Sequence, residues 1–416
     1  MRNGTARARG LGARLFTTTA LTGLAATVIA VALPGDARAA GFALKEQSAT
    51  AQGNAFAGAT AGAEDISYMF FNPAGLIRHE GMQAATVISY ISPHAETTDA
   101  SGGIGGDSSQ DGGVEAVVPA FYGMWSASPD LKVGLGINTP FGLKTKYSEG
   151  WAGRLYAIEA EMLTVNINPA VAYRINDMIS VGAGVQIQYM DVTLSNFDGV
   201  GTAEITGDDW AFGFNLGVLV ELSPRTRLGA SYRSQIDHTL EGEADVPAAG
   251  LTDEPINAAF LSPDSASIGL YHDVNDQWAV MAEVGWTRWS TFEELKVVLD
   301  SGGTLSTVPE DWDDVWFTAL GVTYRPSDQL TLRAGAAFDQ SPIPDSTRSP
   351  RIPGADRTWL SLGASYAVSP DITIDAGYTH VFVADSDVDI DYQGVQLTAS
   401  YENSVDIAVL QATFRF

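Results

Sequence analysis

Alternation of apolar and polar residues with a period of two recurs along nearly the whole chain, and it restricts the possible folds more than any other feature. In the C-terminal segment every even position from Ala408 to Phe416 is apolar, whereas Gln411, Thr413 and Arg415 lie between them. Successive side chains of a β-strand point to opposite faces of its sheet, so this pattern predicts strands with one apolar face. Other segments with the same pattern are 178–190, 329–339, 357–368 and 371–382.

The connections between these strands are of two kinds, and the two kinds alternate. Tight turns are expected at Ser128-Pro129-Asp130, Asn176-Asp177, Ser223-Pro224-Arg225, Asn275-Asp276, Arg325–Asp328 and Ser369-Pro370-Asp371. Long polar or Gly-rich loops are expected at 97–113, 142–161, 195–208, 241–262, 293–312, 340–356 and 385–402. This sorting is typical of a transmembrane barrel and not of a soluble β-sandwich. We therefore predict an all-β fold, an antiparallel transmembrane β-barrel of about 14 strands formed by residues 83–416.

The N-terminus has the features of a secretory signal peptide. Four arginines precede an apolar run from Leu15 to Leu33, and Ala37-Arg38-Ala39 forms a small-x-small cleavage site. Residues 1–39 are therefore predicted to be removed on export, and an uncleaved membrane anchor is the alternative. No later segment has the roughly 18 continuous apolar residues that a transmembrane helix requires, so a closed barrel is the remaining way to satisfy the backbone in lipid.

Charge and composition exclude several classes of function. The chain carries 23 Lys+Arg against 50 Asp+Glu, a net charge of −27, and loss of residues 1–39 would leave −31. A nucleic-acid partner is excluded because its phosphates must be neutralised by Lys and Arg. The chain has no cysteine, and its five histidines are too scattered to suggest a metal site. Neither a nucleophile-elbow motif nor a nucleotide-binding Gly-x-x-x-x-Gly-Lys motif occurs, so we expect neither an enzyme nor a cofactor.

The segment 40–82 does not alternate and is rich in Ala and Gly. Small residues let backbones pack closely, so we predict that this segment is a plug, or hatch, that fills the lumen of a barrel of this width. It ends in Asn72-Pro73-Ala74-Gly75, where the proline fixes a sharp bend. These four residues are the predicted gate, and a periplasmic tail is the alternative interpretation of the segment.

Several short motifs occur in a fixed order along residues 40–416. They are Ala40-Gly41-Phe42-Ala43-Leu44, Phe71-Asn72-Pro73-Ala74-Gly75, Asn138-Thr139-Pro140-Phe141-Gly142-Leu143, Asn166–Tyr173, Trp210-Ala211-Phe212-Gly213-Phe214, Tyr232-Arg233-Ser234 and Pro350–Ser361. In this order they resemble the FadL-type (OmpP1/FadL/TodX) family of outer-membrane transporters of long-chain fatty acids and hydrocarbons. The resemblance covers essentially the whole of the predicted mature chain.

The resemblance implies a 14-stranded barrel with an N-terminal hatch in the bacterial outer membrane. A hydrophobic substrate would be captured by the outer loops, pass the hatch and leave sideways through a kink in the third strand, which is 131–141 here. The kink would fall at Asn138, Pro140, Phe141 and Gly142, because Pro140 removes a ladder donor and Gly142 tolerates a bulge. Without the resemblance, an ordinary strand end would be the simpler interpretation of these residues.

The expected substrate is a long-chain fatty acid, transported passively, and aromatic or alkane hydrocarbons are the alternative. A fatty acid needs a cation for its carboxylate, and Arg154, Arg333 and Arg357 are the candidates. A general porin and an outer-membrane lipase are more distant alternatives. We expect a monomer that contacts outer-membrane lipid and lipopolysaccharide.

The acidic loop 385–391 has a carboxylate at every second residue. This spacing suits either a calcium site or a charged strand extension at the cell surface. The loop lacks the glycine and the distal glutamate of an EF-hand. A strand extension is the simpler interpretation, so no metal is expected.

Overall fold

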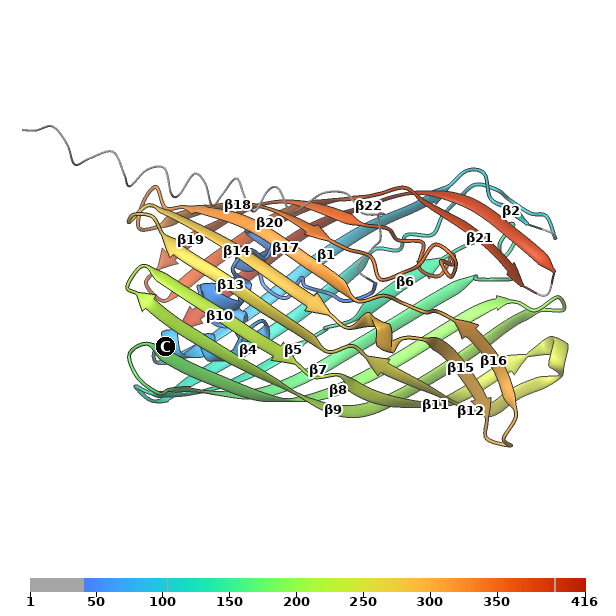
Figure 1. Cartoon of the computed structure of the whole chain (residues 1–416), viewed down its shortest axis with the longest axis horizontal. Helices are drawn as coiled ribbons and strands as arrows, with labels where there is room; N and C mark the ends of the chain where they lie inside the picture. Colours follow the sequence, from blue (N-terminus) through green and yellow to red (C-terminus); the bar gives the residue numbers. More distant parts are fainter. Residues whose placement is uncertain (1–40, 103, 393) are drawn as a thin grey trace, which may run out of the picture. The chain divides into compact units, whose positions relative to one another are not determined.

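The structure is a computed structural model that describes residues 41–416 except 103 and 393. The predicted signal peptide, 1–39, lies outside the described residues. Among the residues that are described, no helix is both long and apolar enough to span a membrane. The described chain begins with a short segment of helical turns and continues as one large antiparallel sheet (Figure 1).

The sheet closes into a barrel where the first strand pairs with the last, from Gln83 opposite Arg415 to Glu96 opposite Glu402. Several spanning strands are interrupted, among them the pairs β5/β6, β10/β11, β12/β13, β14/β15, β16/β17 and β20/β21. The wall therefore has 14 spanning strands, as predicted. The strands are β1 (Met82–Thr97), β2 (Ser101–Gly102), β3 (Gln110–Asp111), β4 (Ala116–Ser128), β5 (Leu131–Asn138), β6 (Gly142–Lys146), β7 (Glu159–Arg174), β8 (Ile179–Phe197), β9 (Thr202–Ser223), β10 (Thr226–Arg233), β11 (Ile236–Val246), β12 (Leu251–Ser262), β13 (Ser265–Asp273), β14 (Trp278–Thr287), β15 (Glu294–Leu299), β16 (Thr304–Pro309), β17 (Val315–Tyr324), β18 (Leu330–Asp339), β19 (Arg357–Ser369), β20 (Ile372–Val383), β21 (Ser386–Tyr392) and β22 (Val395–Arg415).

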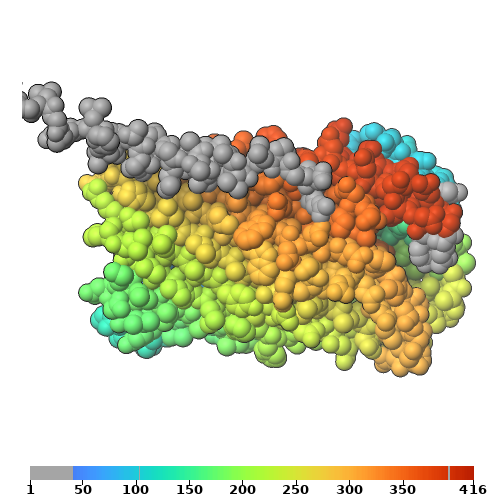
Figure 2. All heavy atoms as spheres, in the orientation of Figure 1, coloured from blue at the N-terminus to red at the C-terminus, as the bar shows by residue number. Residues whose placement is uncertain are grey.

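The two faces of each strand differ as the alternation predicts. In β22 the side chain of Leu410 points outward and is 62% exposed, whereas the next residue, Gln411, points into the barrel and is 2% exposed. Large apolar side chains such as Ile268 and Leu362 cover the outside. Figure 2 shows the strands coloured green to orange as a continuous outer layer of side chains. An apolar outside is the face that lipid requires.

The six tight turns lie where they are predicted. The first and last residues of the barrel chain lie on the same side as these turns, and there Phe416 N–H donates to the Met82 carbonyl. The prediction that 195–208, 241–262, 293–312 and 385–402 are loops is wrong in large part, because strands continue through them: β8, β9, β11, β12, β15, β16, β21 and β22. Ladder pairing extends these strands into the polar segments, so polar residues do not mark a loop there. Figure 1 shows them projecting at the end of the barrel opposite the tight turns.

The N-terminal segment packs against the inner faces of the strands (blue in Figure 1). It contains α2 (Ala49–Gly53), α3 (Ala59–Gly62) and the 3-10 turns η1 (Ile66–Phe70) and η2 (Pro73–Arg78). Glycines on the strands let it approach closely: a Cβ on Gly229 would lie 1.9 Å from the Thr60 carbonyl oxygen, and a Cβ on Gly335 would lie 2.1 Å from that of Asn54. Small residues on both sides therefore bring backbone against backbone.

Candidate functional site

The third spanning strand is interrupted at Thr139-Pro140-Phe141, between β5 and β6. The ladder between β4 and β5 ends where Phe121 lies opposite Ile137. Beyond that point β6 pairs only with β7, and residues 116–120 of β4 pair only with β1, among the strands of the described chain. Proline lacks the N–H that would continue the ladder. A gap in the wall thus separates β4 from β6.

A cavity of about 420 Å³ reaches this gap, and we refer to it as the wall cavity. It is lined by Val118, which faces inward, and also by Val117, which faces outward and is 64% exposed. Gly142 and Leu143 of β6 line the other edge, and Trp359 lines the inner wall. A mostly apolar cavity that extends through an interrupted wall is suited to an apolar molecule.

Residues Gly41–Gln47, the N-terminal arm, are hydrogen-bonded to the interrupted strand. Leu44 N–H donates to the Pro140 carbonyl (2.8 Å), and Gly142 N–H donates to the Phe42 carbonyl (3.0 Å). The Gln47 side-chain amide donates to the Thr139 carbonyl (2.8 Å). The arm therefore supplies backbone partners at the point where the wall ladder is broken.

The ring of Phe42 is 4% exposed and lies in an aromatic cluster inside the barrel. Its centroid is 4.8 Å from that of Trp289 and 5.5 Å from that of Trp312. It also contacts three phenylalanine rings, Phe141, Phe260 and Phe292. Edge-to-face pairs of this kind add to the stability gained from burial alone, so the cluster fixes the position of the arm.

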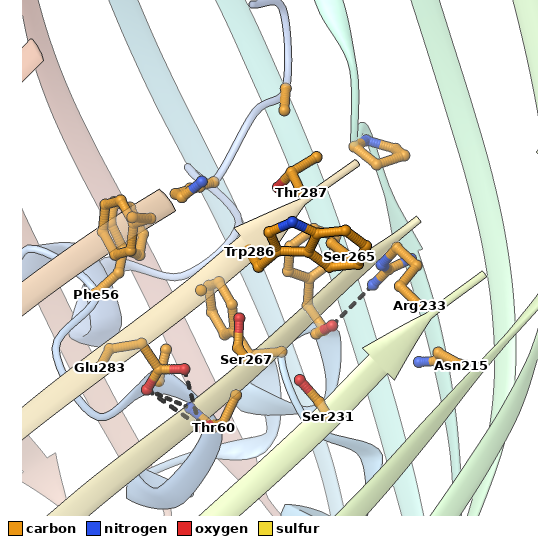
Figure 3. A pocket seen from close by; sticks show the side chains of 18 of the residues that line it. Phe56, Thr60, Asn215, Ser231, Arg233, Ser265, Ser267, Glu283, Trp286 and Thr287 are labelled. Atoms are coloured by element: carbon orange, nitrogen blue, oxygen red, sulfur yellow. Dashed lines mark hydrogen bonds between the residues drawn. The ribbon is translucent and has the colours of Figure 1, made fainter. Parts of the chain in front are cut away.

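On the other side of the arm is a smaller cavity of about 140 Å³, the small cavity (Figure 3). It is lined by Lys45, Phe56, Phe71 and Phe317 and by small residues of the wall. Ala43 and Leu44 line both this cavity and the wall cavity. The arm is therefore the partition between the two.

Asn72, the first residue of the predicted gate, anchors the N-terminal segment to the barrel. Its side-chain amide donates to the carbonyls of Thr60 (2.7 Å) and Val218 (3.0 Å), and its side-chain oxygen accepts from Ala74 N–H (3.0 Å). Thr60 is fixed in turn by the buried carboxylate of Glu283, which accepts from both its N–H and its hydroxyl (Figure 3). These bonds connect η2 to β9 and α3 to β14, two nearby strands of the wall.

The three predicted cations lie in three different places. Arg154 donates to the carbonyls of Gly105 and Trp151 in the outer loops and lines none of the three cavities described in this section. Arg333 forms an ion pair with Glu64. Only Arg357 lines the wall cavity, where its guanidinium donates to the Gly41 carbonyl (3.0 Å).

Lys45 is a cation that the sequence reasoning missed. It lines the small cavity, with its ammonium 4.6 Å from the centroid of the Phe317 ring. The alternation of inward and outward side chains along strands could not identify Lys45, because Lys45 lies on the arm and not on a strand. The available signal was its place directly after the Ala40–Leu44 motif and shortly before the small-residue helices.

A third cavity, of about 440 Å³, lies on the tight-turn side of the N-terminal segment and is strongly polar. Its lining includes Arg227, Asp273, Arg325, Arg333 and Asp375. Arg325 pairs with Asp273, and Arg227 donates to two carbonyls of α3. Charged groups thus occupy the route that leads straight through the barrel.

The acidic segment 385–391 forms most of β21, which pairs with β22. The carboxylates of Asp389 and Asp391 accept hydrogen bonds from Gln396 and Gly394. No group of three or more His, Asp or Glu side chains in the described part of the chain is arranged to hold a metal ion. The geometry is that of a strand extension.

The chain is also similar to known proteins, both in sequence and in fold. The profile of the outer membrane protein transport family (OmpP1/FadL/TodX) matches residues 30–416. The chain belongs to this family. It is 30% identical to a long-chain fatty acid transport protein of Escherichia coli (strain CFT073), and the match covers 88% of this chain and 91% of the relative.

Solved structures have the same fold. A FadL homologue of Pseudomonas aeruginosa superposes with a TM-score of 0.84 at 26% identity, covering 91% of this chain and all of the other. The toluene transporter TbuX of Ralstonia pickettii superposes with a TM-score of 0.68 at 20% identity, covering 89% of this chain and 99% of the other. Members of this family are outer-membrane β-barrels, and the Escherichia coli relative is named a long-chain fatty acid transport protein.

Proposed function

We propose that this protein carries long-chain fatty acids, or molecules of similar hydrophobicity, passively across the bacterial outer membrane. The observation that carries the proposal is the apolar wall cavity, which lies between the hatch and the gap in the third spanning strand. Transport by the fatty-acid relative and by the toluene relative supports the same substrate class. Export with removal of residues 1–39 and contact with lipopolysaccharide remain part of this proposal.

The two possible exits differ in the free energy that an apolar chain would lose on passing through them. Burial of apolar surface is worth about 25 cal/mol per Å², so an acyl chain loses that energy wherever it must cross a polar region. A straight path would cross the polar cavity, which holds Arg227, Arg325 and Arg333. The sideways path past Val118 and Leu143 keeps the chain among apolar groups. Lateral exit into the membrane is therefore the route we propose.

Gating would then reside in the N-terminal arm and in the predicted gate of the hatch, Asn72, Pro73, Ala74 and Gly75. The arm separates the small cavity from the wall cavity, so a substrate passes only when the arm moves. A ligand that competes with Phe42 for the aromatic cluster would favour the displaced arrangement, because a ligand shifts an equilibrium toward the state it binds better.

Capture would begin at the outer loops. Tyr147 and Trp151 stack there at a centroid distance of 4.3 Å, in a buried apolar cluster with Leu397 and Tyr401 of β22, so a ligand would have to open this cluster to reach the rings. Hydrocarbons are the second candidate substrate, favoured by the aromatic cluster around Phe42. A general porin is disfavoured, because the hatch occupies the lumen that ions and sugars would need.

The experiment that tests lateral exit uses the absence of native cysteine. Val118→Cys and Leu143→Cys place one thiol on each edge of the gap. Bridging them with a short bifunctional thiol reagent should block uptake of a labelled long-chain fatty acid by cells that carry the protein. Each single variant, treated in the same way, should transport normally.

The matched control is the pair Ile268→Cys and Val284→Cys, which lie directly opposite each other in the intact ladder between β13 and β14. Bridging this pair should leave uptake unchanged. Normal uptake through a fully bridged gap would refute the lateral route.

A further inference from the structure

Two basic side chains face the two apolar cavities, and neither forms an ion pair with any residue that the structure describes. They are Lys45 in the small cavity and Arg357 in the wall cavity. Other basic residues around these cavities are already occupied. Lys144 pairs with Glu161 at 2.7 Å, and the guanidinium of Arg233 donates to Gln186 and to the Phe70 carbonyl.

Both cations are connected to the N-terminal arm. Lys45 is part of the arm, and its only close ring partner among the described residues is Phe317. Arg357 comes from β19 and donates to the carbonyl of Gly41, at the start of the arm (3.0 Å). A molecule that moves from the small cavity to the wall cavity therefore meets Lys45 before the partition and Arg357 after it.

The same region contains three buried carboxylates, Glu46, Glu283 and Asp339. Each of them interacts electrostatically with the ammonium group of Lys45. The carboxylate of Glu283 points toward Thr60 and accepts a hydrogen bond from the Thr60 hydroxyl (Figure 3). With three carboxylates against two cations, the region does not concentrate small anions. An anion would bind only if it also buried an apolar chain in the cavities.

We propose that Lys45 and Arg357 are successive binding residues for the carboxylate of one amphipathic substrate, which rests on the transport function proposed above. Lys45 holds the carboxylate while the acyl chain lies in the small cavity. Arg357 receives it in the wall cavity, where the carboxylate replaces the Gly41 carbonyl as acceptor and so frees the start of the arm. A charged acceptor forms a stronger hydrogen bond with a guanidinium than a neutral carbonyl does.

The test compares oleic acid with its methyl ester, which has the same chain without the charge. Binding of each probe to the purified full chain, and uptake of each by cells, are measured for Lys45→Met, Arg357→Met and the wild type. Lys146→Met is the matched control, because Lys146 lies on β6 and is paired with Glu159 but lines none of the three cavities. Methionine keeps most of the length of each side chain and removes the charge.

Loss of a hydrogen bond to a charged group predicts that Lys45→Met weakens oleate binding about tenfold or more. Arg357→Met should slow oleate uptake by a similar factor, and Arg357→Lys should restore part of it. Methyl oleate should bind and enter equally well in all variants. The control should match the wild type with both probes.

Equal losses for acid and ester, or the same loss in the Lys146→Met control, would overturn the two-cation proposal and leave the transport function intact. Unchanged oleate handling in both variants would overturn it as well. Failure of the wild type to bind or take up either probe would overturn the transport function together with this inference.

Discussion

Replacement of Phe42 by alanine tests whether the aromatic cluster holds the N-terminal arm in place. Phe42 is 4% exposed and contacts five aromatic rings, so its loss should cost about 3–5 kcal/mol, the usual range for a buried phenylalanine. The barrel ladders do not involve this side chain. The cost therefore falls on the docking of the arm and not on the barrel.

Every 1.4 kcal/mol corresponds to a factor of ten, so the population of the released arm should rise by a factor of about 100 to 4,000. The amides of Leu44 and Gly142, which bond across the arm and the interrupted strand, report this directly. Their hydrogen-exchange protection in Phe42→Ala should fall by that factor. The amides of the intact ladder between β18 and β19 should exchange as in the wild type.

The control is Phe212→Ala, since Phe212 is 68% exposed on the outer face of β9 and the arm packs inside the barrel. It should not change exchange at Leu44 or Gly142. Unaltered protection of these two amides in Phe42→Ala would refute the argument that the cluster anchors the arm. Equal loss in both variants would show that the effect is not specific to the cluster.

Three further perturbations follow from the same contacts. Asn72→Ala removes two side-chain hydrogen bonds to buried carbonyls and a helix cap, at about 1 kcal/mol each, and should raise ion conductance in planar bilayers. Gly229→Ala would place a Cβ 1.9 Å from a carbonyl oxygen of α3 and should likewise raise conductance, whereas Gly123→Ala, with nothing within 4 Å, should not. Burial raises the pKa of Glu310, in the loop before β17, to about 7 from its ordinary value of 4.5. Its contribution to loop stability is therefore complete below about pH 4.5 and is lost as the pH rises toward 7. The fluorescence of Trp312, which donates to Glu310, should follow this change in the wild type and not in Glu310→Gln.

The candidate site could be predicted only where local chemistry was sufficient. Pro140 cannot donate to a ladder and Asn72 caps the turn that Pro73 begins, so both positions could be recognised from sequence. Arg357 was named as one of three cations, but nothing in the sequence separated it from Arg333. Arg333 pairs with Glu64, 269 residues away, and a contact of that range leaves no local pattern.

The sequence by itself determined the barrel, the number of strands and the direction of each strand side chain, because period-two alternation and turn chemistry are local properties of the chain. It did not determine where the N-terminal arm lies. Phe42 reaches Trp289 and Trp312, and Gly41 reaches Arg357, only because the barrel closes around the arm. Tertiary structure alone therefore decided which cations face an apolar cavity, since that depends on how a non-repeating segment packs inside a closed wall.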